Sequence, residues 1–351
     1  SLFATNSSLL AAKVTERSAE TGEHYITRNG SEYLQMLRRA AGGGLVMSFT
    51  TLLKFGIAAL AFSAFWGGFW AGINYAISFV LIQLLHFTVA TKQPAMTAPA
   101  MASKLKNIDE PGAIENFVDE VANLTRTQVA AILGNVLVVF PAALGLAWLY
   151  GSATGAPALN EVHATEVLSA LSLWGPSLLF AAFTGVLLFI SSLIAGWAEN
   201  WFVLNRLDSA MRYNPSITRI LGSRRAERWA AFWRNHISGF AANISLGLML
   251  GLAPAIAGFF GLGLEVRHVT LSSGQLGVAS ATFGLDIIHN SAFWWAVAMV
   301  PFNGAINVMV SFYLAFRMAL RAQNVTGVER SRIYAAIRQR LRSNPLSFFK
   351  P

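Results

Sequence analysis

The sequence predicts an all-α membrane protein with about six transmembrane helices and with both ends of the chain in the cytoplasm. The first observation is composition. Of 351 residues, 54% are hydrophobic and only 12% are charged, against about 25% charged in an average soluble domain. The second observation is distribution, because the charged residues cluster between long apolar stretches. Both features are typical of a polytopic membrane protein.

Six stretches are long and apolar enough for spanning helices, which need about 20 residues each. A tight turn at Trp66-Gly67-Gly68 is expected to separate the first two, and tryptophans near several span ends fit aromatic belts at a membrane interface. The spans divide the chain into an N-terminal segment 1–44, a transmembrane domain 45–318 and a basic tail 319–351. The expected spans are 45–65, 69–89, 129–150, 173–197, 237–262 and 292–318.

The lysines and arginines give the orientation. Segments 1–44, 90–128, 198–236 and 317–351 carry 24 of the 26, whereas the long connections 151–172 and 263–291 carry only Arg267. The positive-inside rule makes the basic side cytoplasmic. We therefore expect a multi-pass protein of the inner (cytoplasmic) membrane. The net charge of +9 then reflects topology and attraction to anionic inner-leaflet lipids, so no direct contact with nucleic acid is expected.

Several segments between or beyond the spans carry their own patterns. Ile333, Ile337 and Leu341 recur every four residues among arginines, which suits a helix lying on the membrane. Apolar positions between Ile114 and Leu124 predict an amphipathic helix. Segment 266–283 contains Gly-Ser turn signals that favour a short hairpin or an ordered loop, with a re-entrant loop as the alternative.

An internal hairpin repeat is also expected. One hairpin begins near Asn135 and passes through residues 161–165; the other begins near Asn243 and passes through residues 265–270. Both run from inside to outside and back, so the repeat is parallel. Repeats in transporters often place a site at their interface. The alternative is that a duplication built a scaffold without a pathway.

Lys54 is the basic residue that the spans place at membrane depth, where a charge costs about 2.5–3.5 kcal/mol. It is the first candidate for an ion, proton or anionic-substrate site. No acid falls at comparable depth, so its expected neighbours are polar amides. The alternative is that Lys54 extends to the cytoplasmic face, and that the amides serve interhelical hydrogen bonds. The predicted intramembrane polar site comprises Lys54, Asn74, Gln83, Asn303 and Asn307.

The remaining motifs predict packing or docking. Gly68-x-x-x-Gly72 and Gly247-x-x-x-Gly251 are small-residue packing motifs. The sequence has no cysteine, its six histidines are scattered, and no catalytic or cofactor fingerprint occurs, so no catalytic residue, metal site or cofactor is predicted. Candidate interfacial or docking residues for a partner protein on the cytoplasmic side are His24, Tyr25, His86, Lys92, Arg224 and Arg225.

Three segments carry a resemblance to a known family. Glu20-Thr21-Gly22-Glu23-His24-Tyr25-Ile26, Lys92-Gln93-Pro94-Ala95 and Arg267-His268-Val269-Thr270-Leu271-Ser272 resemble a bacterial membrane-protein family labelled "site-specific recombinase". Members of that family are longer and begin with a further helical region. The resemblance therefore implies that this chain, which starts at Ser1, corresponds to their C-terminal membrane part. It implies no active-site residues, and the His-x-x-Arg element of tyrosine recombinases does not occur here.

Three functions remain open. The first is a membrane scaffold or accessory subunit whose cytoplasmic surfaces dock a partner, which predicts a tightly packed bundle. The second is a transporter or channel for an anionic or amphipathic solute, which predicts a polar cavity at Lys54. The third follows the family label, DNA recombination with a catalytic part outside this chain, and predicts salt-dependent DNA binding through the cytoplasmic arginines.

Overall fold

A computed structural model describes residues 26–91, 97, 101, 112–322 and 327–349. Six of its helices are long and apolar enough to cross a membrane, and no strand occurs in these residues. The prediction of an all-α membrane protein with six spans is confirmed. The six helices are α2 (Gly30–Ala59), α3 (Ala64–Leu84), α5 (Ala113–Thr154), α7 (Ser177–Leu204), α10 (Ser223–Phe259) and α12 (Ser291–Ala322).

The helices extend beyond the expected spans at most of their ends. Hydropathy marks the part of a helix that matches the hydrocarbon layer, whereas the backbone continues as helix into polar sequence. Thus α2 begins at Gly30, capped by Asn29, whose side chain accepts from the backbone N–H of Glu32 at 2.9 Å. The predicted amphipathic helix after Ile114 is likewise the first part of α5.

The turn between the first two spans lies at residues 60–63, so its placement at Trp66-Gly67-Gly68 was wrong. Those residues are helical because Gly68 is a packing position: a Cβ there would lie 2.7 Å from the carbonyl oxygen of Gly251. A Cβ on Gly251 would lie 2.3 Å from the backbone of Gly68 and Gly72. The two small-residue motifs therefore pack α3 against α10, as predicted.

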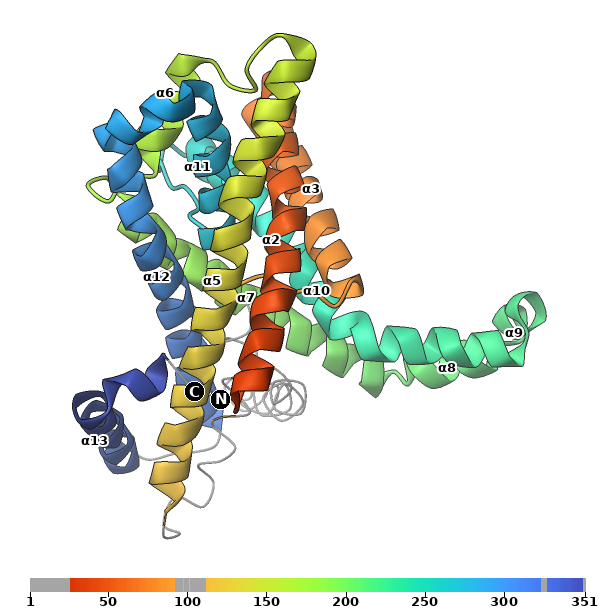
Figure 1. Cartoon of the computed structure of the whole chain (residues 1–351). Coiled ribbons are helices and arrows are strands. Elements are labelled where there is room, and N and C mark those ends of the chain that lie inside the picture. The colour runs from red at the N-terminus through yellow and green to blue at the C-terminus, as the bar shows by residue number, and fades with distance from the viewer. Residues whose placement is uncertain (1–25, 92–96, 98–100, 102–111, 323–326, 350–351) are drawn as a thin grey trace.

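Figure 1 shows α2 beside α5, with α3 and α10 behind them and α12 on the other side. The end of the bundle where α2 and α5 begin is called the basic end below, and the opposite end is called the distal end. The central core includes Met47, Phe79, Leu188, Leu246 and Leu250, contributed by α2, α3, α7 and α10. At the basic end, α8 (Leu207–Tyr213), α9 (Pro215–Leu221) and the start of α10 extend away from the bundle.

The tail forms α13 (Gly327–Ser343), which packs against the bundle at the basic end. Ile333 is 1% exposed and belongs to one cluster with Phe117 of α5 and Phe316 of α12, and Ile337 packs beside them. We expected this apolar stripe to face a membrane. Ile333 and Ile337 face the protein instead, because the extended start of α5 offers an apolar surface that they cover, whereas Leu341 is half exposed.

The connection between α10 and α12 folds back into the bundle. After α10 ends at Phe259, residues 262–268 run without regular structure and α11 (Val269–Phe283) follows, buried along most of its length. The expected short hairpin or ordered loop is therefore wrong, because residues 269–283 are helical, and the re-entrant alternative agrees with the structure. The glycines read as turn signals are contact positions: a Cβ on Gly274 would lie 2.5 Å from Thr51 Oγ1, and one on Gly277 would lie 2.4 Å from the Phe140 carbonyl oxygen.

Candidate functional site

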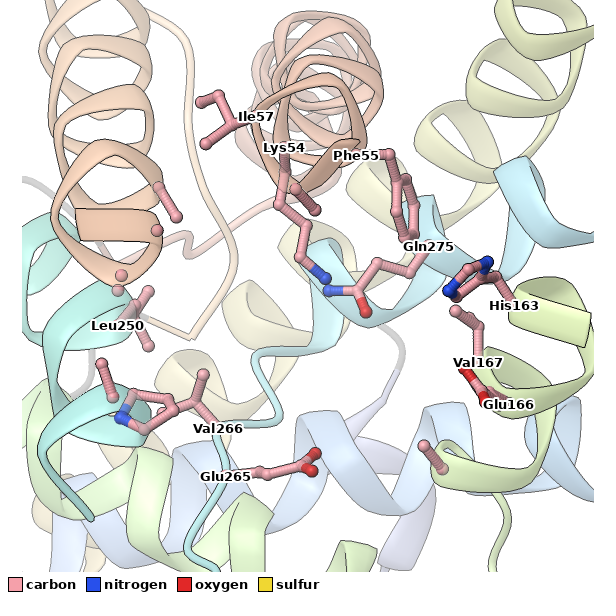
Figure 2. Close-up of a pocket in the computed structure, with 18 of the residues that line it drawn as sticks. Lys54, Phe55, Ile57, His163, Glu166, Val167, Leu250, Glu265, Val266 and Gln275 are labelled. Atoms are coloured by element: carbon pink, nitrogen blue, oxygen red, sulfur yellow. The ribbon is translucent and has the colours of Figure 1, made fainter. Parts of the chain in front are cut away.

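A cavity of about 950 Å³ opens at the distal end. It lies between the last turns of α2, the first half of α3, the last turns of α10, the short helix α6 (Glu161–Ala170) and the re-entrant segment that leads into α11. Figure 2 shows Lys54 reaching into this space from one side, Glu265 from the opposite side, and His163 and Glu166 from a third. The cavity thus gathers residues from three separate parts of the sequence, 54–75, 158–171 and 250–275.

Lys54 lies near the end of α2, which stops at Ala59, and its ammonium lies 4.7 Å from the centroid of the Phe55 ring. Its side chain points toward that of Gln275 on α11 (Figure 2). It forms no ion pair with any described residue. A roomy, partly polar cavity lowers the cost of a charge at membrane depth, because water or a ligand can solvate the ammonium.

Arg267 is held in place at the opposite wall. Its Nη2 lies 2.6 Å from a carboxylate oxygen of Glu265 and donates to the Ala170 carbonyl oxygen at 2.9 Å. Its guanidinium also lies over the Phe180 ring, at 5.3 Å from the centroid. The Ala170 contact fastens the re-entrant segment to the end of α6, and the ion pair with Glu265, within that segment, orients the guanidinium. Arg267 is therefore a structural cation with most of its donors in use.

The part of the cavity wall that α3 and α10 form is apolar and consists mostly of small residues. Ala64, Gly68 and Ala71 of α3 face Gly251 and Ala255 of α10 across this wall. The floor is formed by Tyr75 and Leu250, which belong to the central core. Along α3 the cavity therefore reaches from Ala64 to Tyr75, about 16 Å at 1.5 Å per residue. That depth is about half the thickness of a bilayer's hydrocarbon layer.

The predicted amides lie elsewhere. Asn74 donates to the Thr50 carbonyl oxygen at 2.9 Å, and Gln83 accepts from Asn243 at 2.5 Å. Asn303 donates to Ser272 Oγ at 3.0 Å, and Asn307 bonds to the backbone around α11. None of the four lines the cavity that Lys54 lines. Their bonds join helices to one another, which is the alternative that the sequence left open.

Asn135 completes a buried polar cluster at the deep end of the re-entrant segment. Its Nδ2 donates to the carbonyl oxygens of Ala40 and Thr88, and its Oδ1 accepts from the Ala90 N–H and from Thr270 Oγ1, all at 2.5–2.9 Å. Each polar atom of this amide has a partner, which is what a dry interior requires. The cluster fixes where the re-entrant segment turns into α11.

The remaining candidates were predicted as docking residues. His86 is exposed, with a φ of 57° in the turn after α3, and Arg224 and Arg225 are exposed at the start of α10. His24, Tyr25 and Lys92 lie outside the described residues. Among the described residues, no group of histidine, aspartate and glutamate side chains is arranged to hold a metal ion.

The sequence did not reveal Glu166, Glu265 or Gln275 as neighbours of Lys54. The sequence places Glu166 and Glu265 in the external connections between spans. An acidic residue there does not indicate which span it lies against. The signal that could have found Gln275 is the run from His268 to Leu285, which contains no aspartate, glutamate, lysine or arginine and, at 18 residues, is slightly short for a span of about 20. Such a run between two spans is compatible with a re-entrant helix.

Comparison with known proteins gives one match. A family model described as "Site-specific recombinase" matches residues 1–351, in agreement with the resemblance found in the sequence. A search of curated proteins found no match, and a search of solved structures found none either.

Proposed function

We propose that this chain, which belongs to the site-specific recombinase family, is a membrane-embedded binding protein or transporter for an anionic or amphipathic solute, and that its cavity is the binding site. The observation that carries the proposal is the position of Lys54, a cation without an ion-pair partner among the described residues, on the wall of a cavity of about 950 Å³. Pockets for small ligands commonly measure about 300–1,000 Å³.

The scaffold hypothesis predicts different surroundings for Lys54. A scaffold needs a packed bundle in which a charge at membrane depth is either bonded or placed at an interface. Lys54 instead faces open space beside an aromatic ring and an amide. Packing is dense in the central core, where Leu246 is fully buried, and the cavity stops there. Transport would require the core beneath Tyr75 and Leu250 to open in a second conformation.

The charge distribution supports an orientation for this site. The arginines of α8, α9 and the start of α10 lie at the basic end, away from the cavity. In a bacterial inner membrane, the positive-inside rule would place that end in the cytoplasm. The cavity would then face the periplasmic side. Anionic lipids of the inner leaflet would contact the exposed arginines at the other end.

The test is equilibrium binding of radiolabelled dodecyl phosphate, an anionic amphiphile, to the purified full chain in a neutral detergent. We expect saturable binding that weakens at least tenfold in Lys54→Met, because a hydrogen bond to a charged group contributes about 1.5–3 kcal/mol. Lys54→Arg keeps the charge and should retain most of the affinity.

Arg224→Met is the matched control, since it removes an exposed cation at the other end of the molecule. It should bind the probe like the original chain. Thermal unfolding of each variant checks that the protein is folded. Equal binding by the original chain and folded Lys54→Met would overturn the proposal.

A further inference from the structure

We infer that the cavity ligand is an aminophospholipid, whose phosphate binds at Lys54, whose amine binds at Glu166 and whose acyl chains lie along the α3–α10 wall. This inference rests on the proposed function and names the substrate class of the same site. It follows from three observations: which charges on the cavity wall are left unpaired, where they lie, and which chemistry lines the rest of the wall.

Four acidic or basic residues other than histidine line the cavity: Lys54, Glu166, Glu265 and Arg267. Glu265 and Arg267 are paired with each other at 2.6 Å. Because these two charges are opposite and close together, much of their electrostatic field at a ligand beside Lys54 cancels. The ion pairs among described residues include neither Lys54 nor Glu166. The ammonium of Lys54 and the carboxylate of Glu166 are therefore available to bind a ligand.

These two groups stand on separate elements. Lys54 projects from α2, and Glu166 projects from α6 on another side of the cavity, beside His163 (Figure 2). A simple anion would be attracted by Lys54 and repelled by Glu166. A ligand that carries both a phosphate and an ammonium meets both groups favourably, because each of its charges finds the opposite charge on the wall.

The apolar wall favours a ligand with hydrocarbon chains over a small zwitterion such as an amino acid. Between Ala64 and Tyr75, the surfaces of α3 and α10 present alanine and glycine at the cavity and no charged group. Burying hydrocarbon against such a wall is favourable by about 25 cal/mol per Å². Phe259 and Leu262 are exposed and stand next in sequence to the lining residues Gly258 and Gly263, so acyl chains would meet further apolar surface beyond the wall.

The test uses short-chain phosphatidylethanolamine and phosphatidylglycerol with identical acyl chains, as competitors of dodecyl phosphate on the full chain. Both carry a phosphate, and only the first carries an amine. We expect phosphatidylethanolamine to displace the probe at about tenfold lower concentration than phosphatidylglycerol. Glu166→Gln should abolish this preference and, because it removes a negative charge that repels the probe, should bind dodecyl phosphate at least as tightly as the original chain. Glu166 is exposed, so this variant is expected to fold, which its thermal unfolding checks.

A charge-reversed variant sharpens the test. Lys54→Glu with Glu166→Lys exchanges the two groups, and it should recover a preference for phosphatidylethanolamine that Lys54→Glu alone lacks. Equal displacement by both lipids in the original chain, unchanged in Glu166→Gln, would overturn the inference and leave the binding of anionic amphiphiles standing. Probe binding that does not depend on Lys54 would overturn the proposed function itself.

Discussion

The side-chain amide of Asn307 on α12 is bonded to the backbone at the start of α11. Its Oδ1 accepts from the Val269 N–H at 3.1 Å, and its Nδ2 donates to the carbonyl oxygens of Arg267 and Ala181 at 3.0 and 2.8 Å. One side chain thus satisfies the first N–H of a helix that begins inside the bundle and ties that helix to α7. Water is scarce there, so the amide replaces the solvent that would cap an exposed helix.

Asn307→Leu should destabilise the protein by about 2–4 kcal/mol. Three hydrogen bonds are lost, each contributing up to about 1.7 kcal/mol in a membrane, and buried backbone groups are left without partners. The measurement is the thermal unfolding midpoint in detergent. Asn205→Leu is the control, because Asn205 is exposed and bonds only to its own helix, at Trp201. Equal midpoints for the two variants would contradict the structure.

Gly251→Ala should weaken the α3–α10 contact. A Cβ there would lie 2.3 Å from the Gly68 carbonyl oxygen, so the two backbones must separate, at a cost of about 1–3 kcal/mol. Gly145→Ala is the matched control, since nothing lies within 4 Å of a Cβ on that glycine of α5. Its effect on the unfolding midpoint should be small or stabilising. The idea fails if Gly145→Ala destabilises the protein as much as Gly251→Ala does.

The spans could be read from the sequence because their cause is local. A run of apolar residues must satisfy its own backbone in lipid, and a helix is the way to do so. That Gly68 and Gly251 are packing positions was predictable too, since small residues at a spacing of four lie on one helix face, whereas their contact with each other was not. The start of α3 was not predictable, because glycine is typical both of turns and of close helix packing. Gly67 and Gly68 were interpreted as a turn.

The cavity could not be predicted because it depends on pairs of distant residues. Lys54 was recognised as an anomaly, yet its actual surroundings come from α6 and from the segment after α10. The placement of Glu265 outside the membrane followed from its position after the fifth span. In the structure, Arg267 and its bond to Ala170 bring residues 263–267 back against the bundle, so Glu265 lines the same cavity as Lys54. Asn303 and Asn307 were predicted as neighbours of Lys54 because the sequence offers no acidic residue at that depth.

Arg267→Lys should loosen α6 from the re-entrant segment. Arginine contacts Glu265 and the Ala170 carbonyl oxygen at once, and a lysine has a single ammonium on a flexible stem to serve both. We expect faster amide hydrogen exchange in residues 161–170, with α3 unaffected as the internal control. Because Glu265 is half exposed, the loss of global stability should stay near 1–2 kcal/mol. Unchanged exchange in α6 would show that other contacts hold it.

The absence of cysteine from the chain permits a direct test of the cavity and of its orientation. Gln275→Cys places a thiol on the cavity wall, whereas Ser273→Cys, two residues earlier on α11, places one at a position that is 1% exposed. An anionic, membrane-impermeant thiol reagent should label the first and spare the second, because a buried thiol meets neither water nor reagent. Dodecyl phosphate should protect Gln275→Cys in a dose-dependent way.

The same variants report which side the cavity faces. Ser216→Cys on exposed α9 marks the basic end. If the positive-inside rule holds, the reagent applied to intact spheroplasts should label Gln275→Cys and leave Ser216→Cys unlabelled, and inverted vesicles should give the opposite pattern. Labelling of both thiols from the same side would contradict the separation of the two ends by the membrane. A thiol at Gln275 that reacts only after detergent treatment would mean that lipid fills the cavity, and the proposed aminophospholipid would then be the first ligand to seek in the purified protein.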